Sequence, residues 1–361
     1  MIDFKVFYNK TDSVARLITS FHLLEKDGLI KLQLIENNGN MRKMPSTQMI
    51  EAEAAGKTIA FDMGDRWLLC QAENHDYLRR VDAYFARDYS AREDIVTPYV
   101  FLEDPKVMPF GFNYFSSYYG NPVTKPSAVI PSMKYSLRHL CGVSRCLSPQ
   151  YIEQVPDFKR SDIRILFMAR LWDPSTKRPD PSMSDEQYRY RQYMVEEWES
   201  INQTRIAVMR ALKKYFGQSF FGGMFRDALS ERLCPDLVLP TKMVRKKAYL
   251  DRMKKSDICI GTMGLHKSIG WKMGEYIAAS RAIVAEPLEY VVPGNFEEGR
   301  NYLPFQSAES CCEQVAALLA DPNRLYQMKQ ANHQYYLDYL EPRKQLCNAL
   351  SAAGIPPLCQ L

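Results

Sequence analysis

The fold is decided by the stretch Gly261-Thr-Met-Gly-Leu-His-Lys-Ser-Ile-Gly-Trp-Lys-Met-Gly-Glu-Tyr-Ile-Ala-Ala-Ser-Arg-Ala-Ile-Val284. A short apolar run ends at Gly261 and is predicted to be a buried strand. It is followed by a glycine-containing loop, a helix from about Trp271 and a second strand over Ala282–Ala285. This order is typical of a parallel βαβ unit. In open α/β sheets, ligands bind at the carboxyl ends of the strands, so the loop is expected to line a site.

The alternation of strands and helices occurs twice along the 361 residues. In the first half, strands are predicted over Phe4–Tyr8, Ile30–Ile35, Lys57–Met63 and Asp82–Arg87. After a connector rich in Tyr, Ser and Pro, the apolar run Ile163–Ala169 opens a second series. Chains longer than about 250–300 residues usually form more than one core. The predicted fold is α/β, with two Rossmann-like doubly wound domains that face a cleft.

The expected first domain, with the connector, covers residues 1–154 and the second covers 155–340. The remaining residues, 341–361, form a tail that could cross back to the first domain. Charged residues make up 25% of the chain, and the formal net charge is +5. Because both signs are dispersed, nucleic acid is not expected as a partner, whereas an anionic small substrate or an anionic membrane surface is compatible.

The start of the chain lacks the features of a signal peptide, and no apolar run approaches the roughly 20 residues needed to span a bilayer. A cytoplasmic protein is therefore expected, with peripheral contact at the inner face of the membrane as an option. Nine cysteines are scattered without zinc-ligand spacing, Cys141 and Cys146 being the closest to a metal pair. They are expected to be reduced thiols, and no metal site is expected.

The loop and the helix start carry groups that suit a phosphate. Backbone N–H groups at a helix N-terminus have partial positive charge, and Gly264 and Gly270 let a ligand approach the backbone closely. Further donors come from His266, Lys267, Ser268 and Lys272. Glu275, about one helical turn in, could accept hydrogen bonds from ribose hydroxyls. The predicted ligand is a nucleotide diphosphate.

The segment Glu275-Tyr-Ile-Ala-Ala-Ser-Arg-Ala-Ile-Val284 resembles the donor-binding stretch of GT-B glycosyltransferases. That family usually has a glutamate, seven residues, and a second glutamate that opens an alanine-rich helix. The resemblance implies that Glu275 binds the donor ribose. The first glutamate would fall at Lys267, so the sequence departs from retaining enzymes with a carboxylate there. His266 and Lys267 could instead stabilise the leaving diphosphate by charge.

A second stretch, Leu166-Phe-Met-Ala-Arg-Leu-Trp-Asp173, resembles the opening strand of the family's donor domain. The resemblance implies that Arg170 contacts the diphosphate. A lysine often follows in the family, and the nearest here is Lys177. Lys246 and Lys247 stand where family members place nucleotide-recognising loops, although they could also be a solvated helix start. The donor-binding candidates thus include Arg170, Lys177 and Lys247.

The catalytic candidates are Asp62, Asp65 and His266. The two aspartates lie in Phe61-Asp-Met-Gly-Asp65, which resembles the acidic turn at a strand end in some bacterial members. Either could act as the general base that deprotonates an acceptor hydroxyl, or the turn could have a purely conformational role. His266 could equally be a hydrogen-bonded loop histidine.

The resemblance implies a glycosyltransferase that moves a hexose or related sugar from a nucleotide-diphosphate donor to a glycan or lipid-linked acceptor, as in cell-envelope glycan biosynthesis. Neither metal nor cofactor is expected. The alternatives are a nucleotide-sugar epimerase, a polyol-phosphate transferase, or a non-catalytic sugar-nucleotide-binding subunit. A Rossmann oxidoreductase is disfavoured because no GxGxxG follows the first strand. The donor base, sugar, acceptor, stereochemical outcome and oligomeric state stay open.

Overall fold

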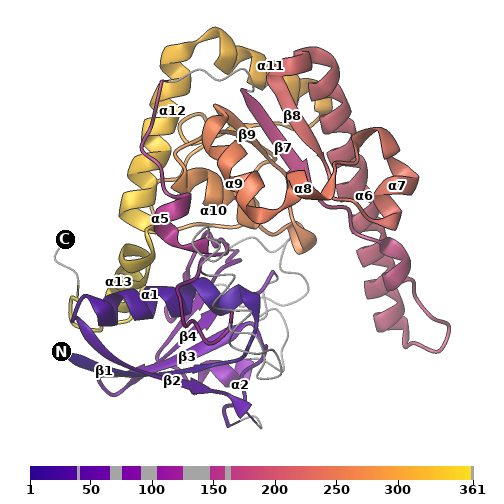
Figure 1. Ribbon diagram of the computed structural model, residues 1–361. Helices are drawn as coiled ribbons and strands as arrows, with labels where there is room; N and C mark the ends of the chain where they lie inside the picture. Colours follow the sequence, from indigo (N-terminus) through magenta and orange to yellow (C-terminus); the bar gives the residue numbers. More distant parts are fainter. Residues whose placement is uncertain (39–40, 66–74, 91–103, 125–146, 159–163, 359–361) are drawn as a thin grey trace.

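A computed structural model describes residues 1–38, 41–65, 75–90, 104–124, 147–158 and 164–358. Figure 1 shows two α/β domains, one above the other, each built on its own sheet. The first sheet has six strands and the second has five. The prediction of two α/β domains is confirmed.

The first sheet has the strand order β2-β1-β3-β4-β5-β6. Its strands are β1 (Ile2–Tyr8), β2 (Ile30–Glu36), β3 (Met49–Ala54), β4 (Lys57–Asp62), β5 (Ala83–Ala86) and β6 (Val107–Pro109). The sequence did not predict β3, which pairs antiparallel with both β1 and β4. The parallel pairing that βαβ units give is present between β1 and β2, β4 and β5, and β5 and β6, whereas β3 makes the sheet mixed.

The antiparallel pairing follows from the turn between β3 and β4. Ala55 and Gly56 connect the two strands, with φ angles of 50° and 74°. Positive φ at both central residues is the feature of the tight turns that join hairpin strands. Asparagine or aspartate usually precedes the glycine in such turns, and alanine here gives a weaker signal.

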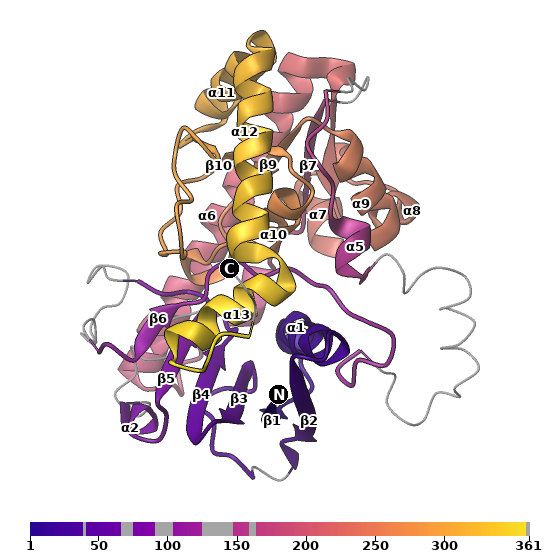
Figure 2. The same cartoon turned by 90° about the vertical axis from the view of Figure 1, so that its left-hand side faces the viewer.

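One face of this sheet is covered by α1 (Ala15–Lys26), which follows a 3-10 turn, η1 (Asp12–Val14). The C-terminal helix α13 (Pro342–Ala352) lies beside α1 in Figure 2. Leu346 and Leu350 of α13 join the core that α1 and the sheet form around Phe21 and Phe61. The short helix α2 (His75–Leu78) packs near Tyr84 in a separate cluster. The end of the chain thus completes the core of the first domain.

The second sheet is parallel throughout, with the order β11-β10-β9-β7-β8. Its strands are β7 (Ile165–Ala169), β8 (Phe220–Met224), β9 (Ile258–Gly261), β10 (Ala282–Ala285) and β11 (Leu303–Pro304). Numbered within the domain, the order is 2-1-3-4-5. The chain therefore proceeds in opposite directions from β7, and the crevice between β7 and β9 is the topological switch point where ligands bind in such sheets.

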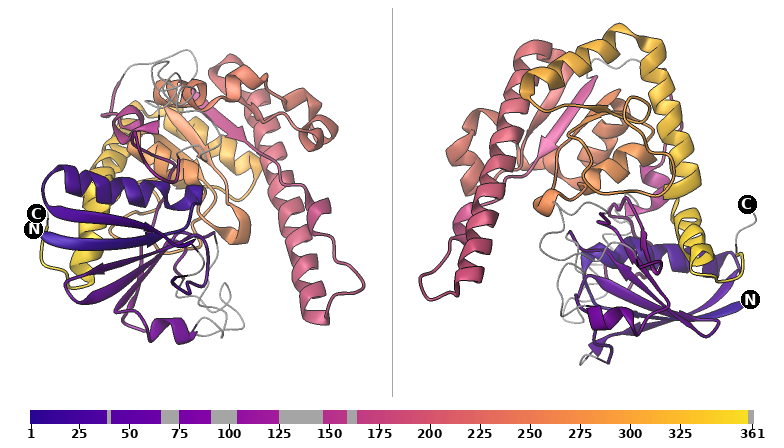
Figure 3. Two further views of the ribbon diagram at one scale, coloured as in Figure 1. Left: turned by 60° about the horizontal axis from the view of Figure 1, so that its bottom comes forward. Right: turned by 180° about the vertical axis from the view of Figure 1, so that it is seen from behind.

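Helices surround this second sheet. They are α5 (Pro149–Ile152), η6 (Pro174–Lys177), α6 (Asp185–Phe216), η7 (Gly217–Ser219), α7 (Ala228–Leu233), η8 (Pro235–Leu237), α8 (Thr241–Val244), α9 (Lys246–Lys255), η9 (Leu265–Lys267), α10 (Trp271–Ala278), α11 (Ala308–Ala320), α12 (Pro322–Tyr335) and a π-helical segment (Tyr336–Leu340). A capping box between Ser184 and Gln187 starts α6. The amino-terminal half of α6 extends beyond the rest of the domain (Figures 1 and 3).

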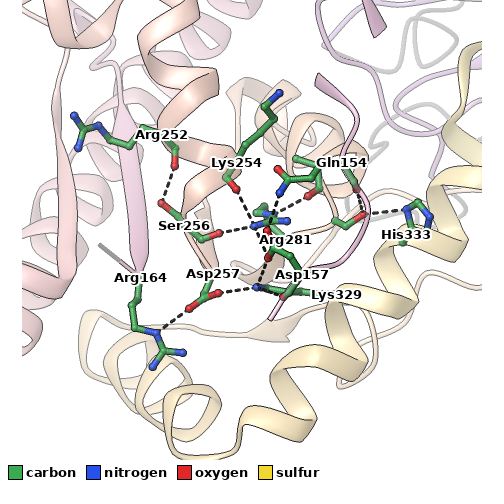
Figure 4. Close-up of polar contacts among 12 residues, drawn as sticks. Gln154, Asp157, Arg164, Arg252, Lys254, Ser256, Asp257, Arg281, Lys329 and His333 are labelled. Carbon is green, nitrogen blue, oxygen red and sulfur yellow. Dashed lines mark hydrogen bonds and ion pairs between the residues drawn. The ribbon is translucent and has the colours of Figure 1, made fainter. Parts of the chain in front are cut away.

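A buried ionic network holds the segment between the domains against the second sheet (Figure 4). Lys329 of α12 is 0% exposed and lies 2.6 Å from Asp257 and 3.3 Å from Asp157. Arg281 donates to the Ser256 carbonyl at 2.9 Å. Because these groups lie at the amino ends of the strands, the network is on the opposite edge from the switch-point crevice and stabilises the domain.

Two expectations concern the whole chain. Among the helices of the described residues, none is both long and apolar enough to cross a membrane. Four cysteines are free and buried, namely Cys234, Cys259, Cys311 and Cys312. Cys347 is disulfide-bonded, so the expectation of reduced thiols is wrong for this residue. Cys141 and Cys146, the pair considered for a metal, lie outside the described residues.

Candidate functional site

A cavity of about 450 Å³ lies at the carboxyl ends of β7 and β9, in the switch-point crevice. Most of its lining comes from these strands, from the loop after β9 and from the start of α10. Asp65 and Arg87 of the first domain complete it. A volume in this range is ordinary for a small-molecule site. The cavity is therefore an interdomain site at the edge where the topology predicts a ligand.

The loop after β9 is held in a tight conformation. His266 and Lys267 have φ angles of 56° and 58°, in the left-handed region that side chains other than glycine rarely adopt. The amide of Gly264 donates to the Ser268 carbonyl at 2.8 Å. A Cβ on Gly264 would lie 2.5 Å from the Ser268 hydroxyl. Two consecutive left-handed residues are a form of backbone strain that occurs at ligand sites.

Helix α10 begins at the cavity. Gly270 is its N-cap, and Trp271 and Lys272 form its first turn. The first N–H groups of a helix have no partner within the helix and carry partial positive charge. Gly270, Trp271 and Lys272 all line the cavity. The helix start thus presents a favourable environment for an anion.

Four cationic side chains and one carboxylate line the cavity. The cations are Arg87, Arg170, Arg205 and Lys272, and the carboxylate is that of Asp65. Arg170 is exposed, directly after β7, with its guanidinium 5.6 Å from the centre of the Phe225 ring. This excess of positive groups, together with the start of α10, favours an anionic ligand.

Lys272 is half-buried as a residue, and its ammonium group is enclosed. The ammonium donates to the Met168 carbonyl of β7. Burial, together with a smaller effect of nearby Arg205, lowers the pKa of Lys272 to about 7, while Glu275 acts in the opposite direction. An anion bound in the cavity would favour the charged form of this lysine.

The first domain contributes an aspartate and an arginine. Arg87, at the end of β5, is buried and donates to the carboxylate of Asp65. It also donates to the Ile269 carbonyl of the second domain at 2.5 Å. The Asp65 side chain is 43% exposed. Arg87 therefore fixes the acidic turn relative to the loop after β9 and leaves the Asp65 carboxylate accessible from the cavity.

Six predicted donor-binding residues line the cavity or frame its loop, and the structure brings them together. Arg170, Gly264, Ser268, Gly270 and Lys272 line the cavity, and Lys267 lines a small adjoining hollow. His266 does not line the cavity. Its ring lies parallel to that of Tyr190, with 6.4 Å between the ring centres, and its carbonyl accepts from the Tyr290 hydroxyl at 2.8 Å.

Four other predicted residues lie outside the cavity lining. Glu275 is 2% exposed and forms an ion pair with Lys246. Lys247 forms an exposed ion pair with Asp251 at 2.6 Å, within one turn of α9. The Lys177 ammonium lies 5.3 Å from the centre of the Trp198 ring.

The fourth is Asp62, which is buried at the end of β4. It accepts hydrogen bonds from the Tyr84 hydroxyl at 2.8 Å and from the Gly64 amide at 3.0 Å. The contacts of Asp62 match the conformational role that the sequence left open for the acidic turn, whereas Asp65 of the same turn reaches the cavity.

The lining residues that sequence reasoning missed include Arg87, Arg205, Trp172 and Phe225. Arg87 is the last residue of the strand predicted over Asp82–Arg87, and its position at a strand end was an available signal. Trp172 follows the predicted strand end at Arg170 by two residues. Arg205 lies in the middle of α6, and no local pattern distinguishes it from the other charged residues of that helix.

No family model matches the chain, and no curated protein matches it. Among solved structures, the chain is similar to a glycosyltransferase from Rickettsia africae, with 12% identity, a TM-score of 0.40, and coverage of 78% of this chain and 67% of that chain. It is similar to Anabaena Alr3699/HepE in complex with UDP and glucose, with 10% identity, a TM-score of 0.41 and coverage of 96% and 98%.

A third similar structure is WaaG, a glycosyltransferase involved in lipopolysaccharide biosynthesis, with 10% identity, a TM-score of 0.42, and coverage of 97% of this chain and 98% of that chain. At these TM-scores the likenesses carry no argument about the activity, and the site rests on the chain's own residues. The protein is a two-domain α/β protein with a cationic interdomain cavity, and the solved structures similar to it include glycosyltransferases.

Proposed function

We propose that this protein transfers a sugar from a nucleotide-diphosphate donor to a saccharide or lipid-linked acceptor. One observation carries the proposal. Arg170, Lys272 and the start of α10 converge on a cavity of about 450 Å³ at the switch point of a parallel sheet. Cationic side chains and a helix N-terminus are the groups that bind a diphosphate in proteins. The donor would lie with its diphosphate against them.

In the proposed reaction, the bond between the anomeric carbon and the diphosphate oxygen breaks, and the acceptor oxygen forms a new bond to that carbon. The departing nucleoside diphosphate gains negative charge on the leaving oxygen. Arg170 and Lys272 would stabilise this charge, as would the N–H groups at the start of α10. These groups would do so without a metal ion or a further cofactor.

Asp65 is the candidate base for the acceptor hydroxyl. Asp65 faces the cavity from the first domain, whereas the side chains and helix start proposed to bind the diphosphate belong to the second domain. Its carboxylate would accept the hydroxyl proton as the new bond forms. Arg87 would keep the carboxylate in place. The acceptor would therefore bind from the side of the first domain, and the two bound substrates together would displace water from the space between the domains.

The donor site is tested by isothermal titration with UDP, GDP, CDP and TDP, beginning with UDP. We expect one of the four to bind. Arg170→Ala and Lys272→Met should each weaken that binding about tenfold or more, because each removes a charge-assisted contact. Arg210→Ala is the matched control, since Arg210 forms an ion pair with Asp236 away from the cavity. Unchanged affinity in both site variants would refute the proposed donor site.

Sugar transfer is distinguished from its alternatives by the product. The nucleotide sugar whose base binds is incubated with candidate saccharide and lipid-linked acceptors, and the products are identified by mass spectrometry. A glycosylated acceptor with release of the nucleoside diphosphate supports transfer. Free epimerised sugar, transfer of a polyol phosphate, or binding without turnover for every acceptor would each contradict it.

A further inference from the structure

Arg205 joins the two loops that border the switch-point crevice. It projects from the middle of α6 and is 8% exposed. One terminal nitrogen, Nη1, donates to the Arg170 carbonyl after β7 at 2.6 Å. The other, Nη2, donates to the Met263 carbonyl after β9 at 2.9 Å, and Nε donates to the Thr262 hydroxyl at 3.1 Å. A single guanidinium therefore spans the crevice.

The connection continues to a third strand. The amide of Met263 donates to Glu286 Oε2 at 2.7 Å, and Glu286 follows β10 directly. The ends of β7, β9 and β10 are thus linked by consecutive hydrogen bonds through Arg205 and Glu286. At one end of this set of hydrogen bonds lies Arg170, which lines the cavity. Met263, in the loop that leads to Gly270 and α10, lies between Arg205 and Glu286.

Burying the charged guanidinium of Arg205 costs free energy, because the charge loses its hydration. Among the described residues, the charge that acts on Arg205 in the opposite direction to burial is that of the Glu286 carboxylate, which Met263 links to it. Burial lowers the pKa of Arg205 to about 10. A neutral amide could donate to only one of the carbonyls, whereas the planar guanidinium has donors directed at both.

We propose that Arg205 is a positioning residue of the diphosphate site, which sets the distance between Arg170 and the loop that leads into α10. The inference rests on the proposed function, because it assigns to Arg205 the alignment of groups that would bind the donor. It predicts that Arg205 acts through Arg170, so that the effects of the two side chains on ligand binding are coupled and not additive.

The test is a double-mutant cycle of Arg205→Gln and Arg170→Ala, with affinity measured by titration for UDP, or for whichever of the four nucleoside diphosphates binds in its place. We expect Arg205→Gln to weaken UDP binding about tenfold in the wild-type background, and about threefold or less in the Arg170→Ala background. Arg205→Lys keeps the charge but cannot span both carbonyls, so it should bind UDP as weakly as Arg205→Gln. Arg210→Gln, on the exposed side of the same helix, is the control for α6.

Each outcome is decisive. Equal losses in both backgrounds, or recovery of affinity in Arg205→Lys, would overturn the positioning role and leave the donor site intact. Unchanged nucleotide affinity in Arg170→Ala would overturn this inference, and unchanged affinity in Lys272→Met as well would overturn the donor site together with it. If Arg205→Gln does not fold, Thr262→Val removes one acceptor of the same guanidinium. It should then weaken binding in the wild-type background and not in Arg170→Ala.

Discussion

Raising the pH from 6 to 8 is expected to weaken the binding of a nucleotide sugar, because Lys272 loses its proton over this range. The pKa of Lys272 is lowered to about 7 by burial. The groups that act on it are Glu275, which favours the charged form, and Arg205, Lys246 and Arg170, which disfavour it. A bound diphosphate would add negative charge beside the ammonium and raise its pKa in the complex.

The size of the effect follows from the free protein. With a pKa of about 7, the charged fraction of Lys272 falls from about 0.9 at pH 6 to about 0.1 at pH 8. If the complex requires the charged form, the observed affinity falls about tenfold, which is about 1.4 kcal/mol. A nucleotide sugar suits this measurement because its esterified diphosphate does not titrate near neutral pH, whereas the terminal phosphate of a free nucleoside diphosphate does.

The assay is titration of UDP-glucose, or of the nucleotide sugar whose base binds, at half-unit steps of pH. Lys272→Met is the matched variant and should bind more weakly with a flatter pH dependence. Asp88, beside Arg87, also has its pKa raised to about 7 by burial. Its ionisation contributes equally to both proteins, so the difference between the two curves reports Lys272. Parallel curves for wild type and Lys272→Met would refute the reasoning.

The same proton changes the stability of the ligand-free protein in the opposite direction. At pH values between the folded-state pKa of about 7 and the ordinary pKa of 10.5, Lys272 binds more protons in the unfolded chain than in the folded chain. The free energy of unfolding should therefore rise with pH in this window, by up to about 1.4 kcal/mol per unit, and level off below about pH 7. Urea unfolding of wild type and Lys272→Met at pH 7 and 9 measures this contribution.

Three further results are expected. Asp65→Asn should reduce the turnover number about 10²-fold or more while nucleotide-sugar affinity is retained, as measured by product formation and titration; full turnover would exclude Asp65 as the base. Asp62→Asn should instead lower stability by about 1–3 kcal/mol in urea unfolding, because its hydrogen bonds to Tyr84 and Gly64 are weakened. Lys329→Met should lower stability by about 1–3 kcal/mol, since Asp257 then loses one charged partner and keeps Arg164 at 2.8 Å. Asp257→Asn in the same chain should recover part of the loss, and an unchanged urea midpoint would contradict the role assigned to the network.

The strands and the main site loop could be predicted because their signals are local. Apolar runs that end at Ala169 and Gly261 indicate buried parallel strands, and the loop to Gly270 follows one of them directly. These short stretches predicted where Arg170 and the start of α10 would lie. The hairpin strand β3 was missed because its turn, Ala55-Gly56, lacks the residues that usually mark such turns.

What the sequence by itself determined is the order of strands and loops at the ligand edge, since periodicity and strand ends are properties of consecutive residues. Only the tertiary structure decided which charges reach the cavity. Glu275 and Lys272 lie within one turn of α10, but of the two only Lys272 lines the cavity. Glu275 instead forms an ion pair with Lys246, outside the lining. Arg87 reaches the cavity from the other domain, and Arg205 reaches it from a helix distant in sequence. That both line the same cavity could not be predicted, because contacts between residues far apart in sequence leave no local pattern.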